Sequence, residues 1–278
     1  MGETLACANQ KGGVGKTTTV VNLATYLSLA GRRVLVIDLD PQGNATSGFG
    51  LDRTSATASS YDLLAGTMAA ERTVHSVGIP NLDLIPSTAA LAGAEVELPG
   101  LAQRERRLRT ALEPFRPAYD HLIIDCPPSL GLLTVNALTA ADTVLIPIQC
   151  EYYALEGLSQ LLETIDLVRD HLNPRLRVKG VLLTMFDART NLAADVAAEV
   201  RRHLGDQVYA TIVPRSVRMS EAPSYGLPIA AYRPDSRGAA AYRDVAVEFL
   251  ARDGLFAEIP VSLVPSPHAA GRPSEVPA

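Results

Sequence analysis

The sequence has few cysteines, no long apolar run and no overall excess of basic residues. Its 278 residues include three cysteines, Cys7, Cys126 and Cys150, which are too few and too scattered for a disulfide framework or a metal knuckle. No stretch approaches the roughly 20 apolar residues that a helix needs to cross a bilayer. The amino terminus also lacks the charged and apolar regions of a secretion signal. Together these absences indicate a cytoplasmic protein.

Charge is unevenly distributed along the chain. Charged residues make up 20% and hydrophobic residues 47%, an ordinary balance that predicts a substantial core. The net charge of −5 argues weakly against a nucleic-acid partner. Between Arg169 and Arg243, however, 12 basic residues outnumber 7 acidic ones, whereas the rest of the chain carries 13 basic and 23 acidic residues. A DNA backbone responds to such a local basic patch rather than to the net charge.

Short β-branched runs alternate with helical stretches along most of the chain. This alternation predicts an α/β fold with a parallel sheet, and strands that are apolar throughout indicate that helices cover both sheet faces. No linker divides the pattern, so residues 1–257 are predicted to form one domain. The expected strands are Thr4–Ala8, Arg33–Ile37, Leu82–Ile85, His121–Asp125, Thr143–Ile148, Val178–Thr184 and Val208–Val213, and the expected helices include Thr17–Ala30, Gln103–Phe115, Leu155–His171, Leu192–Leu204 and Gly238–Ala251.

The last stretch, from Glu258 to Ala278, differs in composition. It contains five prolines and a single basic residue, Arg272. Such a segment cannot bury enough apolar surface to become ordered. Residues 258–278 are therefore predicted to be a disordered, proline-rich tail.

A glycine-rich loop joins the first strand to the first helix. Strand Thr4–Ala8 is followed by Asn9–Gly15 and by a helix that starts at Lys16, which is the context that a phosphate-binding loop needs. Glycines let backbone N–H groups converge on phosphate oxygens, and the helix dipole adds to the attraction. Lys16 is expected to reach the β- and γ-phosphates and Thr17 to bind Mg²⁺. The alternative is a tight turn with incidental glycines.

Two more strands end in acidic loops. The strand Arg33–Ile37 runs into Asp38 and Asp40, and a later strand ends at Asp125. Ligands of open α/β sheets gather at the carboxyl ends of the strands. We therefore expect Asp40 and Asp125 to hold Mg²⁺ through water and Asp40 to orient the attacking water, unless these residues only start turns. Neither loop contains a catalytic Glu or His, so slow hydrolysis is expected.

The loop departs from the generic phosphate-binding pattern, because Gln10 replaces its first glycine and Lys11 adds a second lysine. This form resembles the deviant Walker A motif of the ParA/MinD superfamily. Further segments resemble the chromosomal ParA/Soj partition ATPases, a family with a P-loop NTPase-like fold of a mostly parallel, twisted sheet with helices on both faces. The segments are DLDPQGNATSG (38–48), AGAEVEL (92–98), DCPPSLGLLT (125–134), PIQCEYYALEGLSQLL (147–162), LTMFDARTN (183–191) and VPRSVRMSEAPSYGLPI (213–229), within a resemblance that runs from Thr4 to Leu250.

The resemblance implies a function and a set of site residues. In the family, ATP and Mg²⁺ drive a sandwich homodimer that binds double-stranded DNA nonspecifically, and a ParB-type centromere-binding partner stimulates hydrolysis and releases the DNA. The protein would be nucleoid-associated, with Lys11 reaching the nucleotide of the other subunit. The implied nucleotide-binding residues are Lys11, Gly12, Gly13, Val14, Gly15, Lys16, Thr17, Thr18, Met185, Pro214, Arg215 and Ser216, the implied catalytic residues are Lys11, Lys16, Asp40 and Asp125, and the implied DNA-binding residues are Arg189 and Arg218.

Other interpretations compete with this one. Lys11 could be a solvated loop cation, and Arg189 and Arg218 could form surface salt bridges. A membrane-bound positioning ATPase of the MinD type needs a basic amphipathic helix at its carboxyl terminus, where this chain is proline-rich and nearly uncharged, so no membrane partner is expected. An iron–sulfur reductase needs paired thiolates, and no motif pairs Cys126 with Cys150. A tyrosine autokinase would need a tyrosine-rich tail, and the last 20 residues contain no tyrosine.

Overall fold

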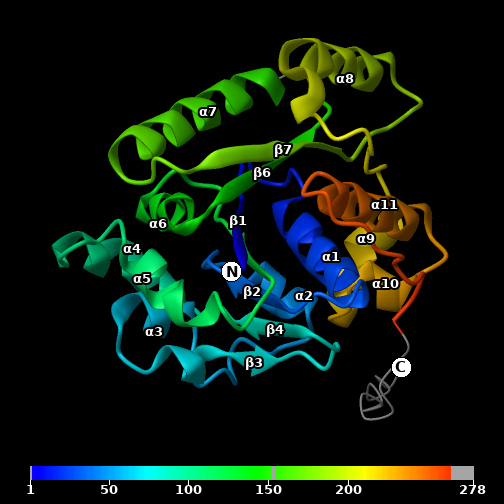
Figure 1. Ribbon diagram of the computed structural model, residues 1–278. Coiled ribbons are helices and arrows are strands. Elements are labelled where there is room, and N and C mark those ends of the chain that lie inside the picture. Colours follow the sequence, from blue (N-terminus) through cyan, green and yellow to red (C-terminus); the bar gives the residue numbers. More distant parts are fainter. Residues whose placement is uncertain (1, 152–153, 264–278) are drawn as a thin grey trace, which may run out of the picture.

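The computed structural model describes residues 2–151 and 154–263, which form a central sheet between two layers of helices (Figure 1). Most of the predicted tail, residues 264–278, lies outside the described residues. The first residues of that tail lie within the described part of the chain. They contact the core, because Ile259 and Leu263 pack against buried hydrophobic residues. In the described part of the chain, no helix combines the length and the hydrophobicity that crossing a membrane requires.

The sheet has seven strands in the order β3-β4-β2-β5-β1-β6-β7. All neighbouring strands pair in parallel except β3 and β4, which confirms the predicted α/β class. The carboxyl ends of β2, β5 and β1 lie side by side, at the edge where such sheets bind ligands. The strands are β1 (Glu3–Cys7), β2 (Val34–Asp38), β3 (His75–Ser76), β4 (Leu82–Ile85), β5 (His121–Asp125), β6 (Thr143–Gln149) and β7 (Arg177–Thr184).

Helices cover both faces of the sheet (Figure 1). Helices α1, α10 and α11 pack on one face, and α3 to α8 pack on the other. The helices are α1 (Lys16–Leu29), α2 (Asn44–Gly48), α3 (Ser60–Ala65), α4 (Leu91–Glu97), α5 (Arg107–Leu112), α6 (Leu132–Ala140), α7 (Ala154–His171), α8 (Asn191–Leu204), α9 (Val217–Glu221), α10 (Ile229–Tyr232) and α11 (Arg237–Ala251), with short 3₁₀ helices η1 (Ala70–Thr73), η2 (Leu98–Gly100), η3 (Glu113–Phe115), η4 (Gly205–Gln207) and η5 (Ala222–Tyr225).

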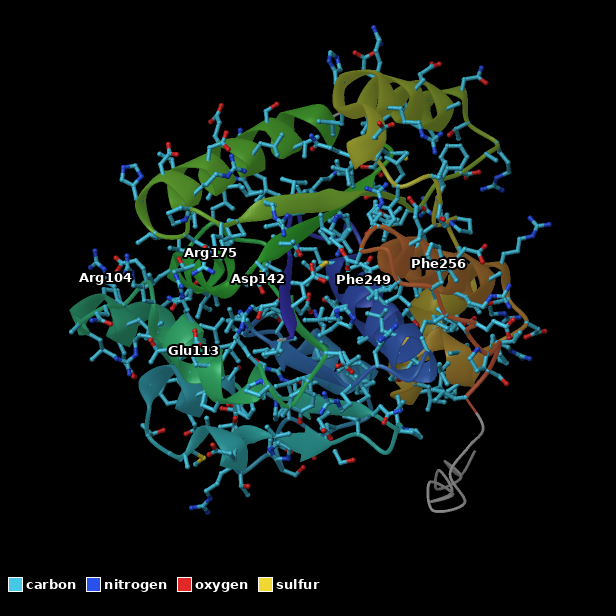
Figure 2. All side chains as sticks on the ribbon, viewed as in Figure 1. Arg104, Glu113, Asp142, Arg175, Phe249 and Phe256 are labelled. Atoms are coloured by element: carbon cyan, nitrogen blue, oxygen red, sulfur yellow. The ribbon has the colours of Figure 1, made fainter. Side chains whose placement is uncertain are left out.

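The side chains of each strand point alternately to the two faces of the sheet, so each strand contributes to the core on both faces. In β1, Leu5 and Cys7 belong to the cluster beneath α1, whereas Ala6 belongs to the cluster on the opposite face. Both faces are therefore dry, which explains why the central strands are apolar throughout. In Figure 2, Phe249 of α11 lies in the interior and is fully buried, whereas Phe256, beyond the end of that helix, is 85% exposed.

The predicted strand Val208–Val213 is wrong. The segment lies beside β7 and forms an isolated bridge with it, but it does not become a strand. The reason is a competing acceptor, because the backbone N–H groups of Ala210 and Thr211 donate to the carboxylate of Glu248 at 2.8 and 2.9 Å. Consecutive N–H groups of an extended strand point to opposite sides, so a single carboxylate that accepts from both holds this segment out of the extended conformation.

The predicted helix Gln103–Phe115 is shorter than expected. Helix α5 covers only Arg107–Leu112 and continues as the 3₁₀ helix η3, which has Pro114 near its start. Gln103 has a φ of 52°, a left-handed conformation that a right-handed helix excludes. At the carboxyl end of α5, Pro114 has no amide hydrogen to donate, and the chain continues there as the tighter 3₁₀ helix η3.

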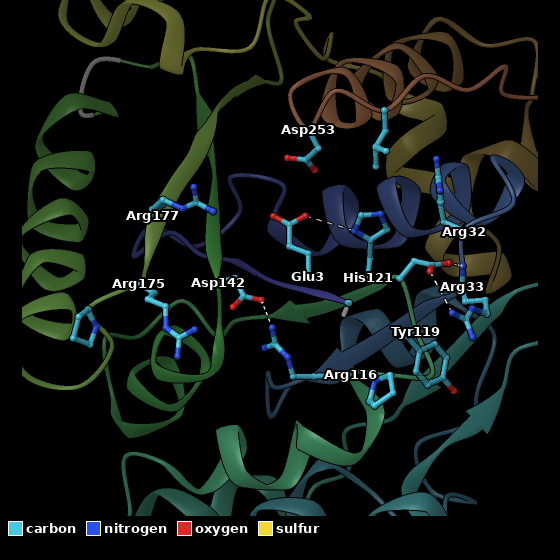
Figure 3. A pocket seen from close by; sticks show the side chains of 15 residues that line it. Glu3, Arg32, Arg33, Arg116, Tyr119, His121, Asp142, Arg175, Arg177 and Asp253 are labelled. Carbon is cyan, nitrogen blue, oxygen red and sulfur yellow. Dashed lines mark hydrogen bonds and ion pairs between the residues drawn. The ribbon is translucent and has the colours of Figure 1, made fainter.

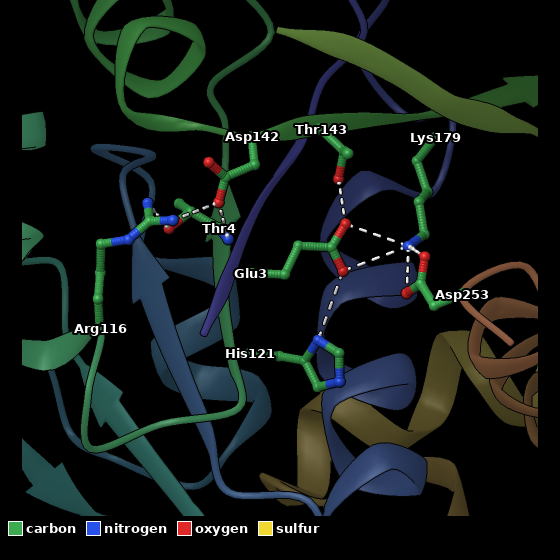
Figure 4. Close-up of polar contacts among 8 residues, drawn as sticks. All are labelled: Glu3, Thr4, Arg116, His121, Asp142, Thr143, Lys179 and Asp253. Atoms are coloured by element: carbon green, nitrogen blue, oxygen red, sulfur yellow. Dashed lines mark hydrogen bonds and ion pairs between the residues drawn. The ribbon is translucent and has the colours of Figure 1, made fainter. Parts of the chain in front are cut away.

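A buried ionic cluster ties the amino-terminal strand to the carboxyl-terminal helix (Figure 4). The Glu3 carboxylate accepts hydrogen bonds from Thr143 at 2.7 Å and from Lys179 at 3.1 Å, and it lies 3.6 Å from His121 Nδ1. Lys179 also pairs with Asp253, just beyond α11. Burial alone would raise the pKa of Glu3, but His121, Lys179 and Thr143 outweigh it and lower this pKa to about 2.

We expect Glu3→Gln to lower the free energy of unfolding at pH 7 by about 2–3 kcal/mol. Because the pKa of Glu3 is lowered from 4.5 on folding, its contribution is complete above about pH 4.5 and is lost as the pH falls towards about 2. Urea unfolding at pH 7 and pH 3 measures this. The difference in the free energy of unfolding between wild type and Glu3→Gln should be about half as large at pH 3 as at pH 7. The control Glu71→Gln changes an exposed residue and should have the same free energy of unfolding as wild type at either pH. A difference that is constant with pH would contradict the assignment.

Candidate functional site

The glycine-rich loop has the backbone conformation of a phosphate cradle. Gly13 and Gly15 have φ values of 75° and 88°, in a region that residues with a Cβ atom rarely adopt. Gly15 caps helix α1, which starts at Lys16, so the helix N-terminus faces the loop and adds its dipole. The Lys16 ammonium is nearly buried and donates to the carbonyl of Lys11 at 3.3 Å. The predicted strand, loop and helix are all present in the predicted order.

Hydrogen bonds to two other strands, β6 and β7, hold this loop in place. The Asn9 amide donates to the carbonyl of Pro147 in β6 at 2.7 Å and accepts the N–H of Lys11 at 3.0 Å. The Thr184 hydroxyl, at the end of β7, donates to the carbonyl of Val14 at 2.8 Å. These bonds fix the cradle before any ligand binds, which reduces the ordering cost of binding.

Asp125 lies beneath the cradle at the end of β5. It pairs in register with Cys7 of β1 on one side and with Asp38 of β2 on the other. Its side chain is fully buried, and neither carboxylate oxygen has a hydrogen-bond partner among the described residues. Burial and the neighbouring Asp38 raise the pKa of Asp125 well above its usual range, while Thr17 and Lys16 act in the opposite direction.

This arrangement fits a magnesium ion at the cradle. The residues described by the structure include no group of three or more His, Cys, Asp and Glu side chains that could hold a metal by themselves. Mg²⁺ does not require such a group, since it keeps several waters and is bound through few protein ligands and the substrate phosphates. The Thr17 hydroxyl would be a direct ligand, and the unsatisfied Asp125 carboxylate would accept hydrogen bonds from metal-bound water.

Asp40 is positioned by a network that starts at Asp38. Asp38 accepts hydrogen bonds from the amide and hydroxyl of Thr46 at 2.8 and 2.6 Å, and burial raises the pKa of Asp38 to about 6. The Thr46 hydroxyl in turn accepts the amide of Ser87, and the Ser87 hydroxyl donates to the carbonyl of Asp40 at 2.7 Å. The Asp40 carboxylate accepts the amide of Gln42 through Oδ1, at 2.9 Å. No hydrogen bond engages its Oδ2 among the described residues, which leaves that oxygen for a water molecule.

Sequence reasoning missed an arginine that grips the same loop. The Arg53 guanidinium donates to the carbonyls of Pro41 and Gln42, which directly follow Asp40. It also fills the space beside Gly43, where an added Cβ would stand 2.2 Å from Arg53 Nε. Nothing in the local sequence marks Arg53, because the contact depends on how the chain folds back after α2.

Met185 and segment 214–216, which the resemblance implies as nucleotide-binding residues, come together beside the cradle. Phe186 and Pro214 form an isolated parallel bridge, so segment 214–216 runs alongside the segment that follows β7. Met185 has a φ of 50°, and its methyl group lies 3.9 Å from where a Cβ on Gly15 would stand. The structure thus brings two distant parts of the sequence to one side of the loop.

The two predicted DNA-binding arginines lie on the surface, each beside an acid. Arg189 is 86% exposed and donates to both carboxylate oxygens of Asp187 at 2.8 and 2.6 Å. Arg218 is 51% exposed and pairs with Glu221 at 2.8 Å. The salt-bridge interpretation therefore describes their contacts in this structure. Solvent screening makes an exposed pair of this kind weak, so it leaves both guanidinium groups open to a stronger anionic partner.

Lys11 also has an acidic neighbour. Its ammonium lies 2.8 Å from the carboxylate of Glu151, which follows β6, and both side chains are more than a third exposed. No local sequence pattern indicates this contact, because 140 residues separate its partners.

Comparison with known proteins shows which family this chain resembles. The family model described as an AAA domain matches residues 2–178. The sporulation initiation inhibitor protein Soj of Bacillus subtilis is 57% identical over 251 residues, which cover 90% of this chain and 99% of Soj. The chromosome partitioning protein ParA of Myxococcus xanthus is 53% identical, over 91% of this chain and 89% of ParA.

A similar solved structure carries the expected ligands. It is described as a cobyrinic acid a,c-diamide synthase of Mycobacterium smegmatis with bound ADP and magnesium. It has a TM-score of 0.81 and 38% identity, and the match covers 94% of this chain and 100% of that one. The predicted cofactors, ATP and Mg²⁺, agree with this relative and with a second structure of the same protein that holds an ATP analogue and magnesium. The chain belongs to the ParA/Soj family of chromosome-partitioning ATPases.

Proposed function

We propose that this chain is an Mg²⁺-dependent ATPase that uses its nucleotide state to switch DNA binding on and off. The ATP-bound protein forms a sandwich homodimer that binds double-stranded DNA nonspecifically. A ParB-type centromere-binding partner stimulates hydrolysis and thereby releases the DNA. The main support is the convergence of Lys16, Thr17, Asp40 and Asp125 on one preformed cradle, in a chain 57% identical to Soj.

The cradle residues have distinct roles in this proposal. The backbone from Lys11 to Thr18 and the Lys16 ammonium bind the phosphates, while Thr17 and Asp125 hold the metal ion, which neutralises charge developing on the phosphates. The free Oδ2 of Asp40 orients the attacking water. Met185 and segment 214–216 line the adenine side. Positioning without a strong general base predicts slow intrinsic turnover.

DNA binding depends on nucleotide in this proposal because dimerisation joins two weak basic patches. Arg189 and Arg218 of each subunit contact phosphate oxygens, for which a guanidinium fork is well suited and which carry no sequence information. Joining two patches raises apparent affinity by roughly 10²–10⁴. The protein would then be cytoplasmic and nucleoid-associated, with residues 1–257 as the ATPase domain and 258–278 as a proline-rich tail.

A DNA-binding assay tests the proposal directly. Fluorescence anisotropy of a nonspecific duplex is measured without nucleotide, with ADP and with ATP, at low and moderate salt. Only ATP should support tight binding, and Arg218→Ala should weaken it by about tenfold or more while the ATP dimer persists. The matched control is Arg72→Ala, which removes another exposed arginine and should bind DNA as tightly as wild type. Affinity should fall steeply with salt, because phosphate contacts release counterions.

Two results would reject the proposal. Binding that ignores nucleotide would leave an ATP-binding protein without a partition switch. ATP-dependent sedimentation with anionic liposomes, in the absence of DNA binding, would favour a membrane-positioning ATPase instead. The synthase name of the solved relative does not change this preference, because that relative is 38% identical, whereas Soj and ParA, the two relatives reported above, are 57% and 53% identical.

A further inference from the structure

A second cavity lies at the opposite edge of the sheet from the phosphate cradle. It has a volume of about 780 Å³ and is lined by residues at the amino ends of the strands, among them Glu3 of β1, His121 of β5 and Arg177 of β7. In Figure 3, Arg175 and Arg177 lie on one side of this cavity and Arg32 and Arg33 on the other. The proposed ATPase function uses none of these residues.

The cavity contains more arginines than its acids pair with. Arg33 pairs with Asp120 at 3.3 Å, and Arg116 pairs with Asp142 at 2.7 Å. The remaining acids of the lining, Glu3 and Asp253, are paired with Lys179. Among the described residues, the lining arginines without an ion pair are Arg32, Arg175 and Arg177.

Buried polar atoms without partners also gather here. Of ten buried side-chain nitrogen and oxygen atoms that lack a hydrogen-bond partner within the described residues, three belong to the lining: Arg32 Nε, Arg116 Nε and His121 Nδ1. His121 Nδ1 lies 3.6 Å from the Glu3 carboxylate, its acidic neighbour in the ionic cluster, which leaves the two arginine Nε atoms. Buried polar groups in native proteins are rarely left unpaired. The lining therefore carries three arginines without an ion pair among the described residues, and the Nε of one of them, Arg32, also lacks a hydrogen-bond partner there.

We propose that this cavity binds a small phosphate-bearing anion. Guanidinium groups pair with phosphate oxygens through two parallel hydrogen bonds, and the unpaired Arg175 and Arg177 are placed to do so from one wall. The cavity volume falls within the range of small-molecule sites, about 300–1,000 Å³. A DNA backbone fits less well, because an extended polyanion would pass the carboxylates of Asp120 and Asp142 as well as the arginines. The site is separate from the nucleotide site.

Calorimetric titration with pyrophosphate, without Mg²⁺ or nucleotide and at constant ionic strength, tests the proposal. Wild-type protein should bind pyrophosphate at two places, the cradle and the cavity. Lys16→Ala weakens the cradle and should leave cavity binding intact. In the Lys16→Ala background, Arg175→Gln/Arg177→Gln should weaken the remaining binding by about 10²-fold, whereas Arg72→Gln/Arg106→Gln, which removes two arginines outside the cavity, should not.

The outcomes separate the alternatives. Loss of all binding in Lys16→Ala would overturn the proposal, as would residual binding that is indifferent to Arg175 and Arg177. Loss of ATP-dependent DNA binding in the cavity variant, with unchanged pyrophosphate binding, would overturn it in favour of a DNA-contacting surface. Circular dichroism and thermal melting of each variant ensure that weakened binding is measured on folded protein. Because the readout is pyrophosphate binding, it does not depend on whether the proposed DNA switch is correct.

Discussion

Asp40→Ala is expected to lower the rate of ATP hydrolysis by about 10²-fold or more, because it removes the carboxylate that orients the attacking water, and a misplaced reacting group costs about that much. Asp40 is held by the amide of Gln42 and, through Ser87, by the network around Asp38, with its Oδ2 left free for water. Alanine removes that oxygen and leaves Lys16 and the cradle unchanged, so ATP affinity should change by less than about threefold. Single-turnover hydrolysis and equilibrium binding of a fluorescent ATP analogue measure the two quantities separately.

The same substitution should prolong DNA binding. If hydrolysis is what releases DNA, the lifetime of the ATP-bound complex should rise by about the factor by which hydrolysis falls. Asp235→Ala, which removes an exposed carboxylate outside the site, is the matched control and should leave both rates unchanged. Undiminished hydrolysis would show that Asp40 does not orient the water. A combined loss of ATP binding and of stability would show instead that Asp40 only supports the loop after β2.

The parts of the site that were predicted from sequence are those that local geometry determines. A strand, a glycine-rich loop and a Lys-Thr helix start are contiguous, so the cradle can be recognised from one segment. Asp38 and Asp125 end parallel strands, Asp40 follows Asp38 by two residues, and the carboxyl ends of parallel strands share one edge of a sheet. The alternation of strands and helices was therefore enough to predict that these acids lie close together, without knowledge of the strand order.

The parts that were missed depend on pairings between distant segments. The failed strand Val208–Val213 has a suitable composition, but the Glu248 carboxylate takes two of its amide donors, and no local pattern shows that α11 delivers an acid there. Arg53 and Glu151 likewise contact the site only after folding. The arginine-lined cavity is assembled from segments as far apart as Gly2 and Leu255, and its excess of unpaired cations becomes visible only when each ion pair is assigned.

Lys11→Ala is expected to weaken the ATP-dependent dimer by about 10²–10⁴-fold. In the proposed sandwich, each Lys11 contacts the nucleotide of the other subunit, and two-fold symmetry repeats that contact. Each charge-assisted hydrogen bond to a phosphate is worth about 1.5–3 kcal/mol, so two lost contacts cost about 3–6 kcal/mol. Binding of ATP to the monomer should be nearly unchanged, since Lys16 and the cradle provide it. Sedimentation velocity in the Asp40→Ala background, where ATP persists, measures the dimer.

The Lys11–Glu151 contact provides a second variant, Glu151→Gln, that should strengthen the dimer where Lys11→Ala weakens it. In the structure, Lys11 pairs with Glu151 of its own chain at 2.8 Å, and it has to leave that carboxylate to reach a second subunit. Glu151→Gln removes this competitor, and because an exposed pair is worth at most about 1 kcal/mol, two freed lysines should tighten the dimer by no more than about 30-fold. A stronger dimer in Glu151→Gln and a weaker one in Lys11→Ala would support contact across the interface. If Lys11→Ala dimerised as wild type, Lys11 would be a loop cation whose only role is its pairing with Glu151.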